Sequence, residues 1–398
     1  MKNILITGGG FHNKGAQAMT FIAVSELKKR FPEHRLIVIS DKDVALMDQE
    51  DYIYNFDIMR TSLCIPHGFY LLGGMAKLYA MKQGLRKKDV QKSMEVWKNT
   101  EYIVDVSGYA LGSNWNNATS MCTALWAALA KKYNAKSIYM PQSFGPFAYH
   151  SLRGKLVSYC IGKYMKKADV VCAREEVGMR LLQEKYHLKN VMKSPDLVLQ
   201  NKEIHLDAIY KKVPNLVELD IKPHSVGIVP NTETIRYMEK EKVLSMYKKL
   251  IERLLRAEYT VYVLAHAKND IGICTEIKNL YPDNENVIEI TNEFSCLEFD
   301  INVAKFEFLI ASRFHSVVHA YRHSVPCVIV GWAEKYRELA KLCGQEEFTF
   351  EVKEGIDIEK LCASVDSMIG QTQKCSDIIR NKIEQVQQEN VFDMLEKL

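Results

Sequence analysis

The fold is decided by residues 306–321, which read FEFLIASRFHSVVHAY. Within them, Phe308–Ala311 is a short apolar run whose length and composition are typical of a buried parallel strand. Ser312 is then expected as the N-cap of a helix. After that helix, Val325–Gly331 indicates another buried strand. The pattern therefore predicts a strand–helix–strand unit of a parallel sheet.

Two side chains in this stretch, Arg313 and His315, are expected where the first strand ends and the helix begins. Ligands of open α/β sheets bind at the carboxyl ends of the strands, and a helix N-terminus favours an anion there. Arginine adds a forked, permanently charged donor suited to phosphate or carboxylate, and histidine exchanges protons near neutral pH. We interpret the pair as a phosphate-binding and proton-transfer site. The alternative is that Arg313 pairs with a surface carboxylate and His315 caps the helix.

The composition is that of an ordinary globular chain long enough for two domains. Its 398 residues are 47% hydrophobic and 26% charged, with a formal net charge of +4 and no long basic block, so nucleic acid is not expected as a partner. Residues 1–7 lead directly into a strand without a secretory signal, and no apolar run reaches the ~20 residues of a spanning helix. The ten cysteines show no metal-binding spacing. We expect a cytoplasmic protein without a metal site or cofactor.

Strands alternate with helices in two successive series. In the first series, the strands are expected to end near Thr7, Ser40, Val106, Met140, Ala173 and Met192. A polar stretch, residues 199–223, follows as the connection. The strands of the second series are expected at 225–229, 260–264 and 287–290, before the opening stretch. We predict an α/β fold of two Rossmann-like domains facing across a cleft, residues 1–205 and 223–371, with 372–398 as a helix packing back on the first domain.

A glycine-rich turn, residues 8–15 (GGGFHNKG), follows the first strand. It lacks the third glycine of a dinucleotide fingerprint, because that position is Asn13. It is not a P-loop either, because Gly15 is followed by Ala16. Glycines before a helix still let a ligand approach the backbone. The alternative is a tight turn that binds nothing.

Residues 63–88 combine an apolar stretch with the basic cluster Arg86-Lys87-Lys88. Such a combination can lie on an anionic membrane surface, which would place the protein at the inner membrane face. The alternative, a buried helix with a solvated end, is the interpretation that we favour.

Several short motifs together resemble the polysaccharide pyruvyl transferase family, over about residues 1 to 345. The motifs are Asn13-Lys14-Gly15, residues 141–147 (PQSFGPF), Ala173-Arg174-Glu175, Ser194-Pro195-Asp196, Ser312–His315, and Val325-Pro326 with Glu334-Lys335. The resemblance implies a GT-B-like arrangement and transfer of the enolpyruvyl group of phosphoenolpyruvate onto two hydroxyls of a sugar, giving a pyruvate ketal and phosphate. The family's Arg-x-His element, associated with donor binding and catalysis, matches Arg313 and His315.

This resemblance leads to a set of expected site residues. His315 is expected to protonate the donor's methylene carbon and Arg313 to bind its phosphate, with the other donor contacts from Arg236, Asn231, His266 and Ser312. The acceptor, a sugar that could be lipid-linked, is expected to contact Asn13, Lys14, Asn114, Gln142 and Arg174. Asp196 and Glu175 are candidates for the general base. No metal is required, because arginines and helix N–H groups can hold the donor's charge.

The chain departs from the family pattern twice in its first half, and this leaves acceptor binding less defined than donor chemistry. Gly15-Ala16 stands where Gly-Asp is common, and residues 107–110 replace a triple glycine. Two other functions remain open. One is a nucleotide-sugar-dependent glycosyltransferase, and the other is a non-catalytic nucleotide- or anion-binding protein.

Overall fold

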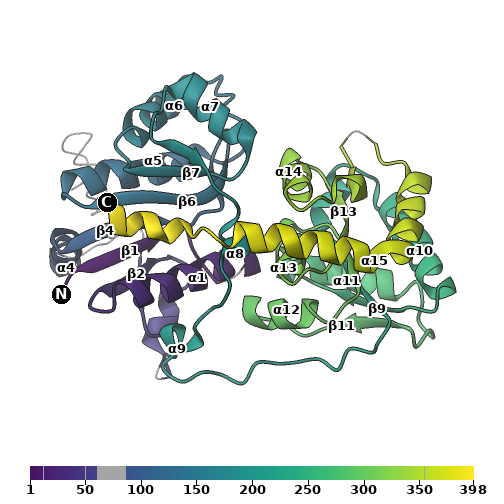
Figure 1. The fold of residues 1–398 in the computed structure, drawn as a ribbon. Coiled ribbons are helices and arrows are strands. Elements are labelled where there is room, and N and C mark those ends of the chain that lie inside the picture. Colours follow the sequence, from purple (N-terminus) through teal and green to yellow (C-terminus); the bar gives the residue numbers. More distant parts are fainter. Residues whose placement is uncertain (12, 50, 61–86, 354) are drawn as a thin grey trace.

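Two parallel sheets, each wrapped by helices, form two lobes that lie side by side (Figure 1). The computed structural model describes residues 1–11, 13–49, 51–60, 87–353 and 355–398. The α/β fold class predicted from the sequence is confirmed. An extended segment, residues 211–224, connects the lobes (Figure 1).

The first sheet has the strand order β3-β2-β1-β4-β6-β7-β8, and β5 pairs with β6. Its strands are β1 (Asn3–Thr7), β2 (Arg35–Ile39), β3 (Asp57–Met59), β4 (Thr100–Asp105), β5 (Tyr109–Leu111), β6 (Lys136–Phe144), β7 (Val170–Ala173) and β8 (Val191–Lys193). The accompanying α-helices are α1 (Lys14–Arg30), α4 (Lys87–Lys98), α5 (Asn117–Lys132), α6 (Leu152–Met165), α7 (Glu176–Tyr186), α8 (Leu197–Gln200) and α9 (Leu206–Ile209).

The second sheet has the order β11-β10-β9-β12-β13-β14. Its strands are β9 (Ser225–Val229), β10 (Thr260–Leu264), β11 (Val287–Ile290), β12 (Phe308–Ala311), β13 (Cys327–Gly331) and β14 (Thr349–Glu351). Its α-helices are α10 (Lys240–Arg256), α11 (Ile271–Lys278), α12 (Cys296–Val303), α13 (Phe314–Arg322), α14 (Glu334–Leu342) and α15 (Ile358–Val386).

The central strands are apolar along their whole length because helices cover both faces of each sheet. In β12 every residue is buried, and Ile310 pairs with Ile228 of β9. In the first sheet, Leu5 of β1 likewise pairs with Ile103 of β4. The predicted strand at 308–311 is confirmed with the bounds that the apolar run indicates. These pairings bring the carboxyl ends of β9, β10, β12 and β13 to one edge of the second sheet.

A continuous apolar core crosses from one lobe to the other. It includes Ala18 of α1, Val198 of α8, Phe299 of α12 and Val317 of α13, all essentially fully buried. Two hydrogen bonds cross the same junction: the Cys296 N–H donates to Oε1 of Gln17 (2.7 Å), and Nε of Arg322 donates to the Asn201 carbonyl (3.1 Å). The two lobes are therefore packed together on the side of α1 and α12.

The C-terminal segment runs along both lobes (Figure 1). Helix α15 is interrupted by non-helical backbone angles at Gln371 and ends at Val386. A 3-10 helix, η6 (Val391–Lys397), follows against the first lobe. There the Val391 N–H donates to Oε1 of Gln200 (3.0 Å), and Asp393 pairs with Arg30 of α1.

Three local features differ from the sequence-based expectation. Strand β6 continues to Phe144, beyond the strand end expected near Met140, and β5 is an additional strand after the one expected to end near Val106. Arg313, and not Ser312, is the N-cap of α13. Most of residues 63–88, the stretch for which membrane contact is predicted, lies outside the described residues. Within the described ranges, none of the helices has the length and apolar character needed to cross a lipid bilayer.

Candidate functional site at the junction of the two lobes

The loop after β12 is held in place by buried hydrogen bonds. The Ser312 carbonyl accepts from Nδ2 of Asn231 (3.2 Å) and from the Tyr336 hydroxyl (2.9 Å), and the Ser312 hydroxyl lies 3.0 Å from that of Tyr247. Ser312 and Asn231 are buried, so in this structure they support the loop from within. This support fixes the direction in which the next residue, Arg313, leaves the strand.

The Arg313 guanidinium forms a forked ion pair with Asp270, in the loop that follows β10. Nε and Nη2 donate to the two carboxylate oxygens at 2.7 and 2.6 Å, and Nη2 also donates to Oδ1 of Asn269 (2.9 Å). Asp270 is fully buried and also accepts from the Thr232 N–H (3.1 Å). A buried forked pair with these extra donors is geometrically rigid. The pair therefore ties the carboxyl ends of β9, β10 and β12 together.

His315 points from α13 toward the first lobe. A Cβ added to Gly15, at the start of α1, would lie 2.3 Å from Nδ1 of His315, so only glycine leaves room for the imidazole. On the other side, Nε2 of His315 lies 4.0 Å from Oδ2 of Asp196. Burial lowers the pKa of His315 to about 3, although the Asp196 carboxylate opposes this effect. The imidazole is therefore neutral in the empty site at pH 7.

Asp196 belongs to a buried ion cluster of the first lobe. Nη1 of Arg174 donates to Oδ2 of Asp196 (2.6 Å), Nε donates to Glu175 (3.0 Å), and Nη2 donates to the Ser143 hydroxyl (2.6 Å). Burial alone would raise the pKa of Asp196, but the charge of Arg174 outweighs it and holds that pKa below its ordinary value. Asp196 is thus an ionised carboxylate between Arg174 and His315.

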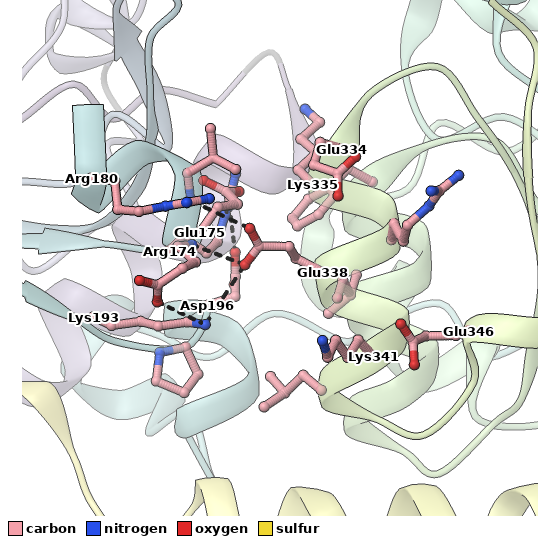
Figure 2. Close-up of a pocket in the computed structure, with 17 residues that line it drawn as sticks. Arg174, Glu175, Arg180, Lys193, Asp196, Glu334, Lys335, Glu338, Lys341 and Glu346 are labelled. Carbon is pink, nitrogen blue, oxygen red and sulfur yellow. Dashed lines mark hydrogen bonds and ion pairs between the residues drawn. The ribbon is translucent and has the colours of Figure 1, made fainter. Parts of the chain in front are cut away.

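A cavity of about 710 Å³ opens between α7 of the first lobe and α14 of the second (Figure 2). Arg174, Asp196, Phe314 and Lys335 are among the residues that line it. Phe314 lies between Arg313 and His315 in the sequence. Its ring faces two cations. Its centroid is 4.3 Å from Cζ of Arg174 and 5.0 Å from Nζ of Lys335.

Lys335 differs from Arg174 because it makes no ion pair within the described part of the chain. Burial, together with the nearby charge of Arg174, lowers the pKa of Lys335 to about 8. An ammonium that is partly withdrawn from water and lacks a carboxylate is stabilised when an anion binds. Lys335 is therefore a candidate anion ligand in a cavity whose lining otherwise carries charges of both signs. Glu338 of α14 reaches across its mouth, where it pairs with Lys193 (3.7 Å) and accepts from the Glu176 N–H (2.9 Å) (Figure 2).

A smaller cavity, of about 300 Å³, lies where the turn before α1 meets the loops after β10 and β11. Its lining includes Phe11, Lys14 and His266. Nζ of Lys14 donates to the His266 carbonyl (2.7 Å), so this lysine spans the junction. Burial lowers the pKa of Lys14, and burial with the charge of Lys14 places the pKa of His266 well below its ordinary value. His266 is therefore a neutral imidazole.

Three imidazoles at the junction have a buried Nε2 without a hydrogen-bond partner among the described residues: His266, His315 and His319. His319 is oriented by Asp300, whose Oδ1 lies 2.6 Å from Nδ1. Buried nitrogens of this kind are costly unless water or a ligand satisfies them. These three imidazoles therefore form a polar region within an otherwise apolar interface between the lobes.

The sequence profile of the polysaccharide pyruvyl transferase family matches residues 13–334. The chain belongs to this family. Among curated proteins, none matches it in sequence.

Solved structures share the fold at low identity. The UDP-GlcNAc 2-epimerase from Methanocaldococcus jannaschii has 12% identity, with 92% of each chain covered and a TM-score of 0.54. Anabaena Alr3699/HepE in complex with UDP has 11% identity, with 100% of each chain covered and a TM-score of 0.55. A glycosyltransferase from Rickettsia africae has 12% identity, with 100% of this chain and 96% of that chain covered and a TM-score of 0.54. The two-lobed arrangement is thus that of GT-B enzymes, and these likenesses concern the fold alone.

For this pyruvyl transferase family member, the structure gathers some of the residues expected at the site. Lys14, His266 and His315 lie at the junction, and Arg174 reaches it through Asp196. Arg313 is close by, but it is paired with Asp270.

The other expected site residues lie apart from this group. Arg236 has a 72% exposed side chain paired with Glu233. Asn13 caps α1, and Asn114 lies exposed on the loop after β5. Gln142 is fully buried, and its Nε2 donates to Asp105 (2.9 Å). In the described ranges, no three His, Cys, Asp or Glu side chains gather as metal ligands.

Lys335 is the group that sequence reasoning left without a role. It occupies the first turn of the helix after β13, as Arg313 does after β12, so its position at the edge of the sheet could have been recognised. The proximity of Arg174 could not have been recognised, because Arg174 belongs to the other lobe. Asp270 was likewise hidden, because its partner Arg313 lies 43 residues away in the sequence.

Proposed function

We propose that the protein transfers the enolpyruvyl group of phosphoenolpyruvate onto two hydroxyls of a sugar, forming a pyruvate ketal in cell-surface polysaccharide synthesis. The observation that carries the proposal is the pair of cations, Arg174 and Lys335, that face the Phe314 ring in the cavity between the lobes. Membership of the polysaccharide pyruvyl transferase family supports the reaction class.

The donor carries two anionic groups, a phosphate and a carboxylate, and each of them needs a positively charged contact. Lys335 has no ion pair within the described residues and would bind one of them directly. The N-terminus of α13 would favour the other. Arg313 uses Nε and Nη2 on Asp270 and Asn269, so in this proposal it contributes to the donor through Nη1. Its charge already acts on Lys335, whose pKa it helps to lower after the larger effects of burial and Arg174.

The reaction needs one proton at carbon and the removal of two protons from hydroxyls. Protonation of the donor's methylene carbon leaves a cationic C2, which the first sugar hydroxyl attacks with loss of its proton. The C2–O bond to phosphate then breaks, and the second hydroxyl closes the ring. One hydroxyl proton replaces the proton used at carbon, and the other leaves with phosphate, so the protons balance.

His315 is the group proposed to carry the proton. In the empty site its imidazole is neutral, because burial lowers its pKa to about 3. A bound trianion beside it favours the imidazolium, as Asp196 already does from 4.0 Å. Binding of the donor therefore favours the uptake of a proton from water by His315. Positioned acid–base catalysis of this kind contributes roughly 10²–10⁴-fold in rate.

Replacing His315 by alanine tests the proposal. The variant should release no phosphate from phosphoenolpyruvate in the presence of a diol sugar, and it should unfold at the wild-type temperature. His150→Ala, at an exposed position of the first lobe, is the matched control and should retain full turnover. Near-normal turnover in His315→Ala would remove His315 from the mechanism.

A nucleotide-sugar-dependent glycosyltransferase is the second candidate. It is favoured by the GT-B fold, which is shared with Anabaena Alr3699/HepE in complex with UDP, and by the cavity at the ends of β10 and β11. Thermal unfolding with phosphoenolpyruvate, UDP or GDP separates the two. A ligand that binds the folded state raises its unfolding temperature. Stabilisation by a nucleotide alone would favour the glycosyltransferase.

A further inference from the structure

Helix α6 exposes an apolar stripe on the outside of the first lobe. Leu152, Leu156 and Tyr159 are 85%, 60% and 64% exposed. Their spacing of four and three residues places them on one face of the helix, which we call the α6 stripe. The opposite face, with Val157, Ile161 and other residues, is buried against the lobe. The helix lies at the outer end of the lobe, away from the second sheet (Figure 1).

Helix α6 and the chain that precedes it carry charge of a single sign. Residues 106–168 contain eight lysines and arginines and no aspartate or glutamate. Five of these cations lie on α6 or just after it, and all five are exposed: Arg153, Lys155, Lys163, Lys166 and Lys167. Nζ of Lys163 lies 5.7 Å from the centroid of the Tyr159 ring, so a cation borders the stripe directly.

We propose that the α6 stripe docks this protein onto an anionic phospholipid bilayer. Exposed leucines beside an aromatic ring suit the boundary between headgroups and acyl chains, and lysines surrounding them suit anionic headgroups. Long lysine side chains can reach the headgroups while the leucines insert. An apolar protein partner would match the leucines but leave five cations unpaired. Charge complementarity therefore selects the bilayer as the occupant.

The position of α6 connects this surface to the cavity between the lobes. Its Ser158 hydroxyl lies 2.9 Å from that of Tyr186, at the end of α7, and the first turn of α7 lines the cavity. A docked protein would thus hold the cavity close to the bilayer, where a sugar attached to a lipid would be presented. Binding to the bilayer does not depend on which donor the cavity accepts.

Sedimentation of the full chain with phospholipid vesicles tests the proposal. Wild-type protein should sediment with vesicles of phosphatidylcholine and phosphatidylglycerol, and not with phosphatidylcholine alone. Leu152→Ser with Leu156→Ser should weaken binding about tenfold or more, because the leucines can no longer insert. Lys163→Glu with Lys166→Glu should separately weaken it about tenfold or more, because two attractive charges near the anionic surface become repulsive. Lys248→Glu, on the exposed face of α10 in the other lobe, should leave binding unchanged.

Measurements of the salt dependence of binding and of the oligomeric state complete the experiment. Binding to the anionic vesicles should fall as salt is added, because surface charges are screened. Binding that is equal for neutral and anionic vesicles, or that both double variants retain, would overturn the proposal. So would a wild-type dimer that Leu152→Ser with Leu156→Ser dissociates while vesicle binding is absent, since the stripe would then be an interface between two copies. Unchanged unfolding temperatures of the variants exclude misfolding as the cause.

Discussion

Replacing Lys335 tests whether its ammonium binds the donor, because its lowered pKa gives a specific pH dependence. Only the protonated amine attracts an anion, and its pKa in the empty site is about 8. The affinity for phosphoenolpyruvate is therefore complete below that pH and is lost above it. One pH unit above the pKa, about a tenth of the lysines carry the charge, so Lys335 should lower kcat/KM for phosphoenolpyruvate by about tenfold for each further pH unit. This loss adds to the one from His315, whose pKa of about 3 lies below the whole range.

The assay is the initial rate of phosphate release at varied phosphoenolpyruvate concentration, from about pH 6 to about pH 10, since kcat/KM reports the ionisation of the free enzyme. Lys335→Arg keeps a charge that does not titrate in this range, so the additional loss above about pH 8 should disappear and only the loss due to His315 should remain. Lys335→Gln should raise KM at every pH, because the charge is absent throughout. Lys341→Arg, an exposed lysine lining the same cavity, is the matched control and should reproduce the wild-type profile.

The result that would refute the reasoning is an alkaline loss of the same size and midpoint in Lys335→Arg. Another group would then be titrating, and Lys335 would not be a donor ligand. A wild-type profile that stays flat through pH 10 would equally contradict it, because the amine would have to keep its proton well above about 8.

Two further substitutions probe how the site is held. Gly15→Ala should lower turnover at least tenfold with little change in stability, because the new methyl group would displace the imidazole of His315; Gly370→Ala, which meets no atom within 4 Å, should be neutral in turnover. Equal turnover of the two glycine variants would mean that the imidazole tolerates displacement. Asp270→Asn should destabilise the protein by about 3 kcal/mol in urea unfolding, because it leaves the Arg313 guanidinium partly buried without its countercharge. A loss below roughly 0.5 kcal/mol, as expected for a surface pair, would show that the ion pair is well solvated.

The strands could be predicted where their side chains are buried on both faces. The runs at 225–229 and 308–311 have the bounds expected from their apolar residues alone. The end of strand β6 lies beyond the expected position near Met140. The sequence favours an earlier end because Pro141 has no N–H to donate to a neighbouring strand. The structure accommodates it where β6 changes partners, since its pairing with β4 ends at Tyr139 and its pairing with β5 begins at Ser143. The proline thus lies between two pairing regions, which no local pattern reveals.

The sequence predicts those site residues that directly follow one strand, but not the partners that other strands contribute. The positions of Arg313 and His315 after β12 follow from the apolar run before them. Their partners do not, because Asp270 and Asp196 come from other strands, and Asp196 comes from the other lobe. Which cation keeps its charge free for a ligand therefore depends on packing between distant segments. In the sequence, Arg313 is the obvious anion ligand. In the structure Arg313 is paired with Asp270, whereas Lys335 has no ion pair among the described residues.

The asymmetry of the junction has a mechanical consequence. On the side of α1 and α12, the lobes are joined by a buried core, by the Gln17–Cys296 bond and by Lys14. Across the cavity mouth, the contact runs through Glu338, which pairs with the exposed amine of Lys193 and accepts from the Glu176 N–H. Rotation of one lobe about an axis near α1 would separate α7 from α14 while the buried side stays intact. Raising the ionic strength weakens the Glu338–Lys193 attraction, so salt should widen the entrance and speed exchange of ligand long before it unfolds the chain.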